Sequence, residues 1–182
     1  MKLKELYQKE IVPALKERFG YTNLLAVPRV LKVTINVGVG RFTKEKSYID
    51  AVAENLSRIS GQRAILTKAK KSIAGFKVRE GNIVGVTVTL RGDRMYDFLT
   101  KLVNITFPRV RDFRGIEESK VDRSGNLSVG FKEHIAFPEI KLDEVENVHG
   151  LEINISTTAK TKDEGLELFR LLGFPFKKNL SK

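Results

Sequence analysis

One segment of the chain gathers basic side chains without any acid. Small polar residues, glycine and one aromatic residue, Phe76, lie between them. Lysine and arginine neutralise phosphates, hydroxyl and backbone N–H groups position them, and an aromatic ring can stack on a base. A short charge run is more often a solvated face, but an unbalanced run of this kind predicts RNA binding. The seven basic residues between positions 55 and 79 are Arg58, Arg63, Lys68, Lys70, Lys71, Lys77 and Arg79.

Two other segments carry polar side chains at every second residue. Apolar residues alternate with them in 31–37 and 84–91, which predicts two strands with one apolar and one polar face each. Taken alone, the polar faces fit a half-covered sheet. Beside the basic segment they predict a sheet surface that docks on RNA backbone and minor-groove hydroxyls. The polar residues are Lys32, Thr34, Asn36, Thr87, Thr89 and Arg91.

Two glycines, Gly38 and Gly40, follow the first of these strands. Residues without a Cβ allow a phosphate to approach the main chain closely. They do not form a dinucleotide-binding fingerprint, because Thr43 occupies the position of its third glycine.

The sequence offers little for catalysis or metal binding. His134 and His149 are the only histidines, there is no cysteine, and no metal-spaced cluster, nucleophile elbow or phosphate-binding Walker loop is present. We therefore expect no catalytic residue, no metal and no cofactor, and a protein that is not an enzyme.

Two further regions leave alternatives open. The stretch 108–115 holds three arginines, one acid and Phe113, so it is either a binding loop or a turn closed by Asp112 and Arg114. From Glu139 to Glu167 eight acids face three bases, which indicates an end of the molecule that meets solvent or a basic protein. A solvated acidic face is the commoner explanation. The acids are Glu139, Asp143, Glu144, Glu146, Glu152, Asp163, Glu164 and Glu167.

Composition narrows the class of partner. The formal charge of +11 over 182 residues favours a polyanion. No apolar run approaches the roughly 18 residues that span a bilayer, and the first residues lack the apolar stretch of a secretory signal. We expect a cytoplasmic protein without membrane contact.

The spacing of apolar residues predicts four helices. The first covers 3–19, is kinked by Pro13 and ends at Gly20, and the second ends at Gly61. Asp93 is expected to cap the third, and Thr161 with Glu164 forms a capping box before the fourth.

Besides the two polar-faced strands, strands are expected at 62–68, 126–131 and 151–155. Residues 69–82 are expected to form a long exposed loop or hairpin, and 107–125 a long loop. Because strands and helices intermix with hairpin-type connections, the fold class predicted is α+β, with an antiparallel β-sheet, helices packed on one face and long basic loops. No linker or repeat divides the chain, so a single domain over 1–182 is expected.

Many ordered blocks of the sequence resemble bacterial ribosomal large-subunit protein five. The diagnostic stretch is ENLSRISGQRAILTKAKKSIA at 54–74. Further matching blocks are VPRV at 27–30, INVGVG at 35–40, AGFKVREG at 74–81, TLRGDRMYDFL at 89–99, FPRVRDFRG at 107–115, AFPEI at 136–140, TTAKTKDEG at 157–165 and FPF at 174–176.

This resemblance implies a ribosomal protein of the large subunit that binds 5S rRNA at the central protuberance. It also implies contacts with 23S rRNA, with neighbouring ribosomal proteins including one of the small-subunit head, and with tRNA in the peptidyl site. Together with the charge and polarity patterns, it gives as expected rRNA-binding residues Lys32, Thr34, Asn36, Gly38, Gly40, Gln62, Arg63, Thr67, Lys68, Lys70, Lys71, Thr87, Thr89 and Arg91.

The resemblance assigns the tRNA contact to the loop that follows. Its expected tRNA-binding residues are Ser72, Ala74, Gly75, Phe76, Lys77 and Arg79.

An RNA-recognition regulator outside the ribosome is the alternative function. Gly75-Phe76-Lys77-Val78 faintly echoes the ribonucleoprotein motif of that class. The polar strand faces, however, lack the paired aromatic residues on which such modules stack bases.

Overall fold

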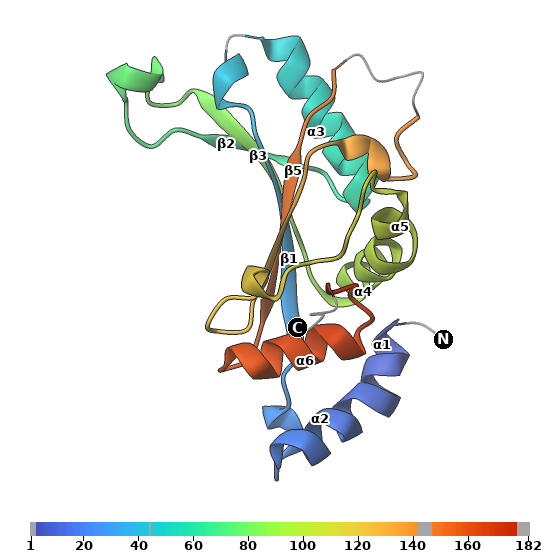
Figure 1. Cartoon of the computed structure of the whole chain (residues 1–182). Coiled ribbons are helices and arrows are strands. Elements are labelled where there is room, and N and C mark those ends of the chain that lie inside the picture. The colour runs from blue at the N-terminus through green and yellow to red at the C-terminus, as the bar shows by residue number, and fades with distance from the viewer. Residues whose placement is uncertain (1–2, 44, 142–146, 178–182) are drawn as a thin grey trace, which may run out of the picture. The chain divides into compact units, whose positions relative to one another are not determined.

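The structure is a computed structural model that describes residues 3–43, 45–141 and 147–177 (Figure 1). The chain divides into two compact units. The first comprises Met1–Val33, Arg91–Val129 and Asn154–Lys182, and the second comprises Thr34–Leu90 and Gly130–Ile153. A single domain over 1–182 stays a prediction.

The strands form one antiparallel sheet of five strands in the order β2-β3-β1-β5-β4. Together with the helices this confirms the predicted α+β class, and every strand expected from the alternation is present. The strands are β1 (Val30–Gly38), β2 (Ile65–Lys68), β3 (Ile83–Leu90), β4 (Leu127–Phe131) and β5 (Leu151–Thr157).

Burial along β1 departs from the prediction at one residue. Val33, Ile35 and Val37 are buried as expected, but Leu31 is 45% exposed. Val30 and Val33 are both buried with two residues between them, so regular alternation begins only at Val33. Leu31 therefore falls outside the apolar face that the pattern predicted.

The helices include two π-helical turns. Each π turn stands just before a proline, Pro13 or Pro108. Proline lacks an N–H and its ring clashes with the carbonyl four residues earlier, and the wider turn accommodates both effects. The segments are α1 (Leu3–Leu6), η1 (Tyr7–Ile11, π), α2 (Val12–Phe19), α3 (Lys46–Ser60), α4 (Gly92–Lys101), η5 (Leu102–Thr106, π), α5 (Phe107–Arg109) and α6 (Lys162–Leu171).

Two helix-end predictions have different outcomes. The capping box before α6 is confirmed, because the Thr161 side chain accepts from the Glu164 N–H and the Glu164 side chain accepts from the Thr161 N–H. Asp93 as the cap of α4 is wrong, since Arg91 occupies that position without a side-chain hydrogen bond. Asp93 instead accepts from Lys4 at 2.6 Å.

The prediction that all of 107–125 is loop is also wrong. The helical path of α4 and η5 continues through α5, so irregular chain begins only at Val110. Pro108 does not end the helix, because the π turn directly before α5 accommodates its ring and its missing N–H.

Helix α3 and strand β3 provide the core of the second unit. The helix contributes the buried side chains of Ile49, Val52, Leu56 and Ile59, and it packs against β3. Val86, Val88 and Leu90 are the buried side chains of that strand. The opposite, polar side of β3 is thereby left uncovered by α3. No helix within the described residues is long and apolar enough to cross a membrane.

Candidate nucleic-acid interface

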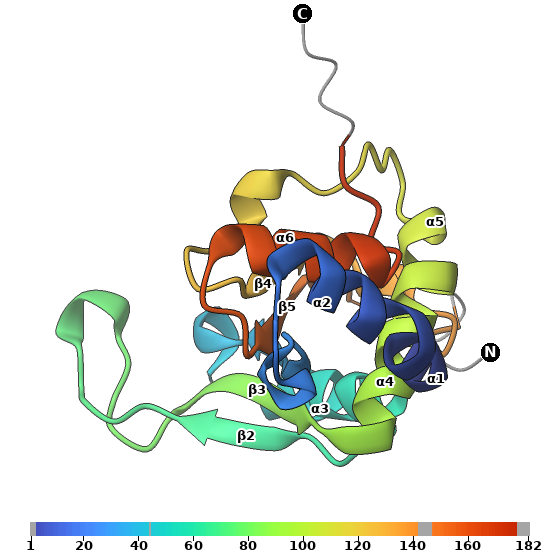
Figure 2. The same ribbon diagram turned by 90° about the horizontal axis from the view of Figure 1, so that it is seen from below.

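Residues 69–82 form an ordered hairpin, here called the finger, that joins β2 to β3 (Figures 1 and 2). At its base the Ala69 N–H donates to the Asn82 carbonyl at 2.8 Å. Nearer its tip, the Ile73 N–H donates to the Val78 carbonyl at 2.9 Å and forms an antiparallel bridge with it. Figure 2 shows the finger extending away from α3. The prediction of a loop or hairpin is confirmed as a hairpin.

The finger exposes its side chains. Phe76, in the 3-10 turn Ala74–Phe76, is 77% exposed, and the following Lys77 adopts φ 53, the left-handed conformation that turns the chain back. Lys70, Lys71 and Arg79 are exposed as well. An aromatic ring left in water among cations has no role in the core, and this favours an external partner.

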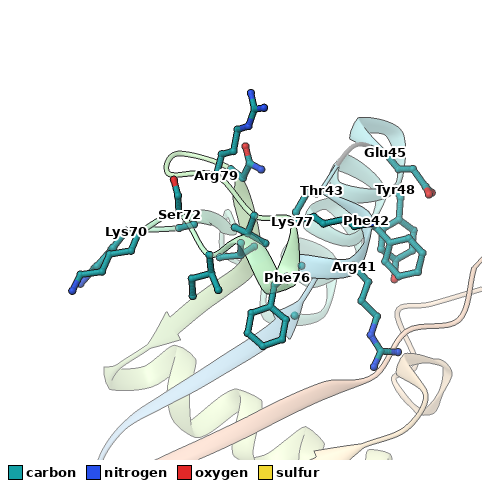
Figure 3. A pocket seen from close by; sticks show the side chains of 18 of the residues that line it. Arg41, Phe42, Thr43, Glu45, Tyr48, Lys70, Ser72, Phe76, Lys77 and Arg79 are labelled. Carbon is teal, nitrogen blue, oxygen red and sulfur yellow. The ribbon is translucent and has the colours of Figure 1, made fainter.

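A broad open groove lies between the finger and the segment that connects β1 to α3 (Figure 3). Its volume of about 2110 Å³ exceeds the roughly 300–1,000 Å³ typical of small-molecule sites. Its described lining holds one acid, Glu45, against five cations. These are Arg41, Lys70, Lys71, Lys77 and Arg79. The size and the charge both indicate a large anionic partner.

The sides of β1, β3 and β2 that carry polar residues meet in a polar strand face, on which Asn36 is exposed, the threonines are half-buried and Gly85 is buried. This polar strand face is defined as Thr34, Asn36, Thr67, Gly85, Thr87 and Thr89. Thr67 on β2 pairs with Gly85 on β3. A Cβ on Gly85 would stand 2.6 Å from the Thr67 hydroxyl and 3.6 Å from the Asn36 side-chain oxygen. The absence of that Cβ lets the Thr67 hydroxyl and the Asn36 side chain lie against the backbone of β3, so polar groups of three strands meet at this point.

Some predicted RNA-binding residues also have partners within the protein. The Thr87 hydroxyl donates to the Ile35 carbonyl at 3.0 Å, and the Gln62 amide donates to the Thr89 carbonyl at 3.1 Å. The Ser72 hydroxyl accepts from the Glu80 N–H at 2.8 Å. These three side chains thus stabilise the surface that they help to form, and each retains a further donor or lone pair for a partner.

The structure brings most of the predicted rRNA-binding residues together in the second unit. Two of them, Lys32 on β1 and Arg91 directly after β3, belong to the first unit. Arg63, before β2, and Lys68, at its end, are exposed.

Gly38 and Gly40 are exposed on either side of the buried Val39, and neither adopts a positive φ. A Cβ at Gly38 would meet nothing within 4 Å, and at Gly40 only the Val84 carbonyl at 3.9 Å. The fold itself does not require glycine at these positions, so their open main chain is available to a partner.

Sequence reasoning missed the wall of the groove opposite the finger. Arg41 and Phe42 lie in the 3-10 turn Gly40–Phe42, and the Phe42 ring packs on Tyr48 of α3 with centroids 4.4 Å apart. Burial, and next the Glu45 carboxylate, raise the pKa of Tyr48 above its ordinary value. The sequence did hold a signal for this wall, because Arg41 and Phe42 place a basic and an aromatic residue directly after Gly40.

The loop at 108–115 does not present its aromatic residue to a partner. Phe113 stacks on the buried Phe107 with centroids 5.1 Å apart, and Asp112 adopts φ 54. This ring contributes to packing, whereas the three arginines of the loop are exposed together with Pro108 and Asp112.

Part of the acidic C-terminal stretch has structural roles. Glu164 caps α6, and Glu167 pairs with Arg18. Asp143, Glu144 and Glu146 lie outside the described residues.

The two histidines stack on each other in the second unit. Their rings are parallel, with centroids 3.9 Å apart, and the His149 N–H donates to Nδ1 of His134 at 3.3 Å. Burial, followed by the neighbouring His134, lowers the pKa of His149 to about 4. Within residues 3–43, 45–141 and 147–177, no group of three or more potential ligands is arranged to hold a metal ion.

Comparison with known proteins gives concordant matches. The model of the family "Ribosomal protein L5" matches residues 23–79, and the model of the C-terminus of the same ribosomal family matches residues 83–176. "Large ribosomal subunit protein uL5" of Desulforapulum autotrophicum is 55% identical over 175 residues, covering 96% of this chain and 98% of that protein. The protein of the same name from Fervidobacterium nodosum is 54% identical over 176 residues, covering 97% and 96%. That from Halothermothrix orenii is 52% identical over 174 residues, covering 96% and 97%.

Proposed function

The chain belongs to the ribosomal protein L5 family, structural and non-catalytic proteins of the large ribosomal subunit, and we propose that in this particle it anchors 5S rRNA. The observation that carries the proposal is the continuity, in one unit, of the polar strand face with a basic segment that contains no acid. Cations supply attraction to phosphates, while hydroxyl, amide and main-chain groups fix the position of a folded RNA.

The residues proposed to bind rRNA are those predicted from the sequence, and most of them belong to the second unit. In the second unit, Lys68, Lys70 and Lys71 would neutralise phosphates, and Asn36, Thr67 and Thr89 would meet ribose hydroxyls. The remaining members are Lys32, Thr34, Gly38, Gly40, Gln62, Arg63, Thr87 and Arg91.

The experiment that tests this proposal replaces Lys68, Lys70 and Lys71 by glutamine. All three side chains are exposed, so the fold should be unaffected while affinity for 5S rRNA falls at least tenfold, because about three phosphate contacts are lost. Binding is measured by titration of labelled 5S rRNA at fixed salt. A matched control replaces Lys9, Lys16 and Lys160, exposed lysines of the first unit, by glutamine. Equal affinity of the two triple variants would contradict the proposed surface.

The finger is proposed to contact tRNA in the peptidyl site. Its exposed Phe76, Lys77 and Arg79 offer stacking and charge at the end of a hydrogen-bonded hairpin, and Ser72, Ala74 and Gly75 shape the turn. Further proposed partners are 23S rRNA and neighbouring ribosomal proteins, one of them in the small-subunit head.

The alternative of an RNA-recognition regulator has less support. The polar strand face carries threonine, asparagine and glycine where such modules present aromatic rings, so base stacking on the sheet would be weak. Equal affinity for 5S rRNA and for an unstructured strand would favour this alternative.

A further inference from the structure

We propose that the groove between the finger and the Gly40–Phe42 turn binds an unpaired RNA nucleotide, with its base stacked on Phe42 and its phosphate at Arg41. This inference rests on the proposed RNA-binding function of the second unit and assigns it a subsite that reads a base rather than only a backbone. Of the Gly40–Phe42 turn, only Gly40 was expected from the sequence to bind RNA, whereas Arg41 and Phe42 were not.

Phe42 is held in place for stacking. Its N–H donates to the Val39 carbonyl at 2.9 Å, and its carbonyl accepts from the Glu45 N–H at 2.9 Å. Tyr48 supports the ring from α3 at a tilt of 44°. Despite this support the side chain of Phe42 is 38% exposed, so one part of the ring remains open to the groove. A pre-positioned aromatic ring loses little conformational entropy when a base stacks on it.

The opposite wall supplies a second aromatic ring. Phe76 on the finger is 77% exposed and also lines the groove. In Figure 3 the side chains of Phe76 and Arg41 extend to the same side, while Lys70 extends away from the Phe42–Tyr48 pair. Arg41 directly precedes Phe42 in the same 3-10 turn and lines the groove, so it is the cation to which we assign the phosphate of a nucleotide stacked on Phe42.

Charge selects RNA over an apolar partner. Five cations and one acid line the described groove, and the exposed main chain at Gly38 and Gly40 borders it. A purely phosphate-binding surface has no use for two exposed aromatic rings, whereas an unpaired nucleotide requires both stacking and charge. An acidic protein segment meets only the charge, so the observations favour RNA.

The test compares a short RNA strand with an abasic strand of the same length, by fluorescence anisotropy with the full chain. Phe42→Ala should weaken binding of the base-bearing strand about tenfold and leave the abasic strand unchanged, since stacking on one aromatic residue is lost. Phe42→Trp should bind the base-bearing strand at least as tightly as the unchanged protein, because tryptophan keeps an aromatic ring for stacking. Arg41→Gln should weaken both strands alike, because it removes a phosphate contact.

Matched controls separate this subsite from the proposed 5S rRNA surface. Leu25→Ala removes an exposed apolar side chain of the first unit and should change neither strand. The triple variant of Lys68, Lys70 and Lys71 tests the proposed 5S rRNA surface. If it bound 5S rRNA as tightly as the unchanged protein, that surface would be wrong, but a selective effect of Phe42→Ala on the base-bearing strand would still support the subsite. If Phe42→Ala lowered the affinity for both strands equally, or for neither, the proposed subsite would be wrong. Tighter, Phe42-dependent binding of a polyglutamate peptide would overturn it too, in favour of an acidic protein.

Discussion

At the scale of single residues, the stacked histidines make the folded state sensitive to acid. The pKa of His149 lies at about 4 in the folded protein, below its ordinary value of 6.5, because burial opposes the charged ring. The unfolded chain therefore binds a proton more readily, and the contribution of neutral His149 to stability is complete above pH 6.5. It is lost as the pH falls toward 4, where the loss reaches about 3 kcal/mol.

The variant His149→Phe should reduce this loss, since phenylalanine keeps an aromatic ring against His134 but takes up no proton. We expect the difference in unfolding free energy between pH 7 and pH 4.5 to shrink by about 2 kcal/mol, measured by urea denaturation. His134→Phe serves as a comparison, because burial lowers the pKa of His134 as well. An unchanged pH dependence in His149→Phe would show that the ring is already protonated or exposed in the folded protein.

At the scale of elements, the finger is a separable structure. Its hydrogen bonds close at Ala69 and Asn82 and again between Ile73 and Val78, so the tip can be shortened without breaking the pairing of β2 with β3. Replacing residues 74–77 by a two-residue Asn-Gly turn should leave 5S rRNA affinity within about twofold, because the turn closes the hairpin between Ile73 and Val78.

The same shortened finger should weaken tRNA binding to the peptidyl site of reconstituted ribosomes by about tenfold, because it removes Phe76 and Lys77. Filter binding of labelled tRNA provides the measurement, and Leu25→Ala, which removes an exposed side chain of the first unit, provides a control with the full finger. If both RNAs were lost together, the finger would be part of the main rRNA surface and not an independent contact.

At the scale of the whole molecule, the charge of +11 predicts strong dependence of binding on salt. Each phosphate contact releases counterions, so six contacts give a plot of log affinity against log salt with a slope of about −4 to −5. The Lys68, Lys70 and Lys71 variant should reduce this slope by about 2 to 3. Titrations of 5S rRNA between 50 and 300 mM KCl, spanning roughly the range in which such slopes are linear, measure both values. A flat response would remove the electrostatic basis of the proposed function.

The sequence by itself determined the features that depend on neighbouring residues. The alternation over Val86–Leu90 of β3, the capping box of Thr161 and Glu164 and the hairpin at 69–82 all follow from contacts between residues a few positions apart. The alternation predicted for Val84 and Gly85 does not hold, because Gly85 is buried. The basic segment is likewise visible in the sequence, because exposed charge needs no partner from elsewhere in the chain.

Only the tertiary structure decided which distant residues meet. Leu31 is exposed and Asp93 pairs with Lys4, although local pattern predicted a buried side chain and a helix cap. The contact between the Phe42 and Tyr48 rings could not be predicted from the sequence either. It arises from the packing of two separate elements, and no short-range spacing of residues indicates it. Long-range packing can override a local preference, since that preference contributes only about 1 kcal/mol at a helix cap or a strand position.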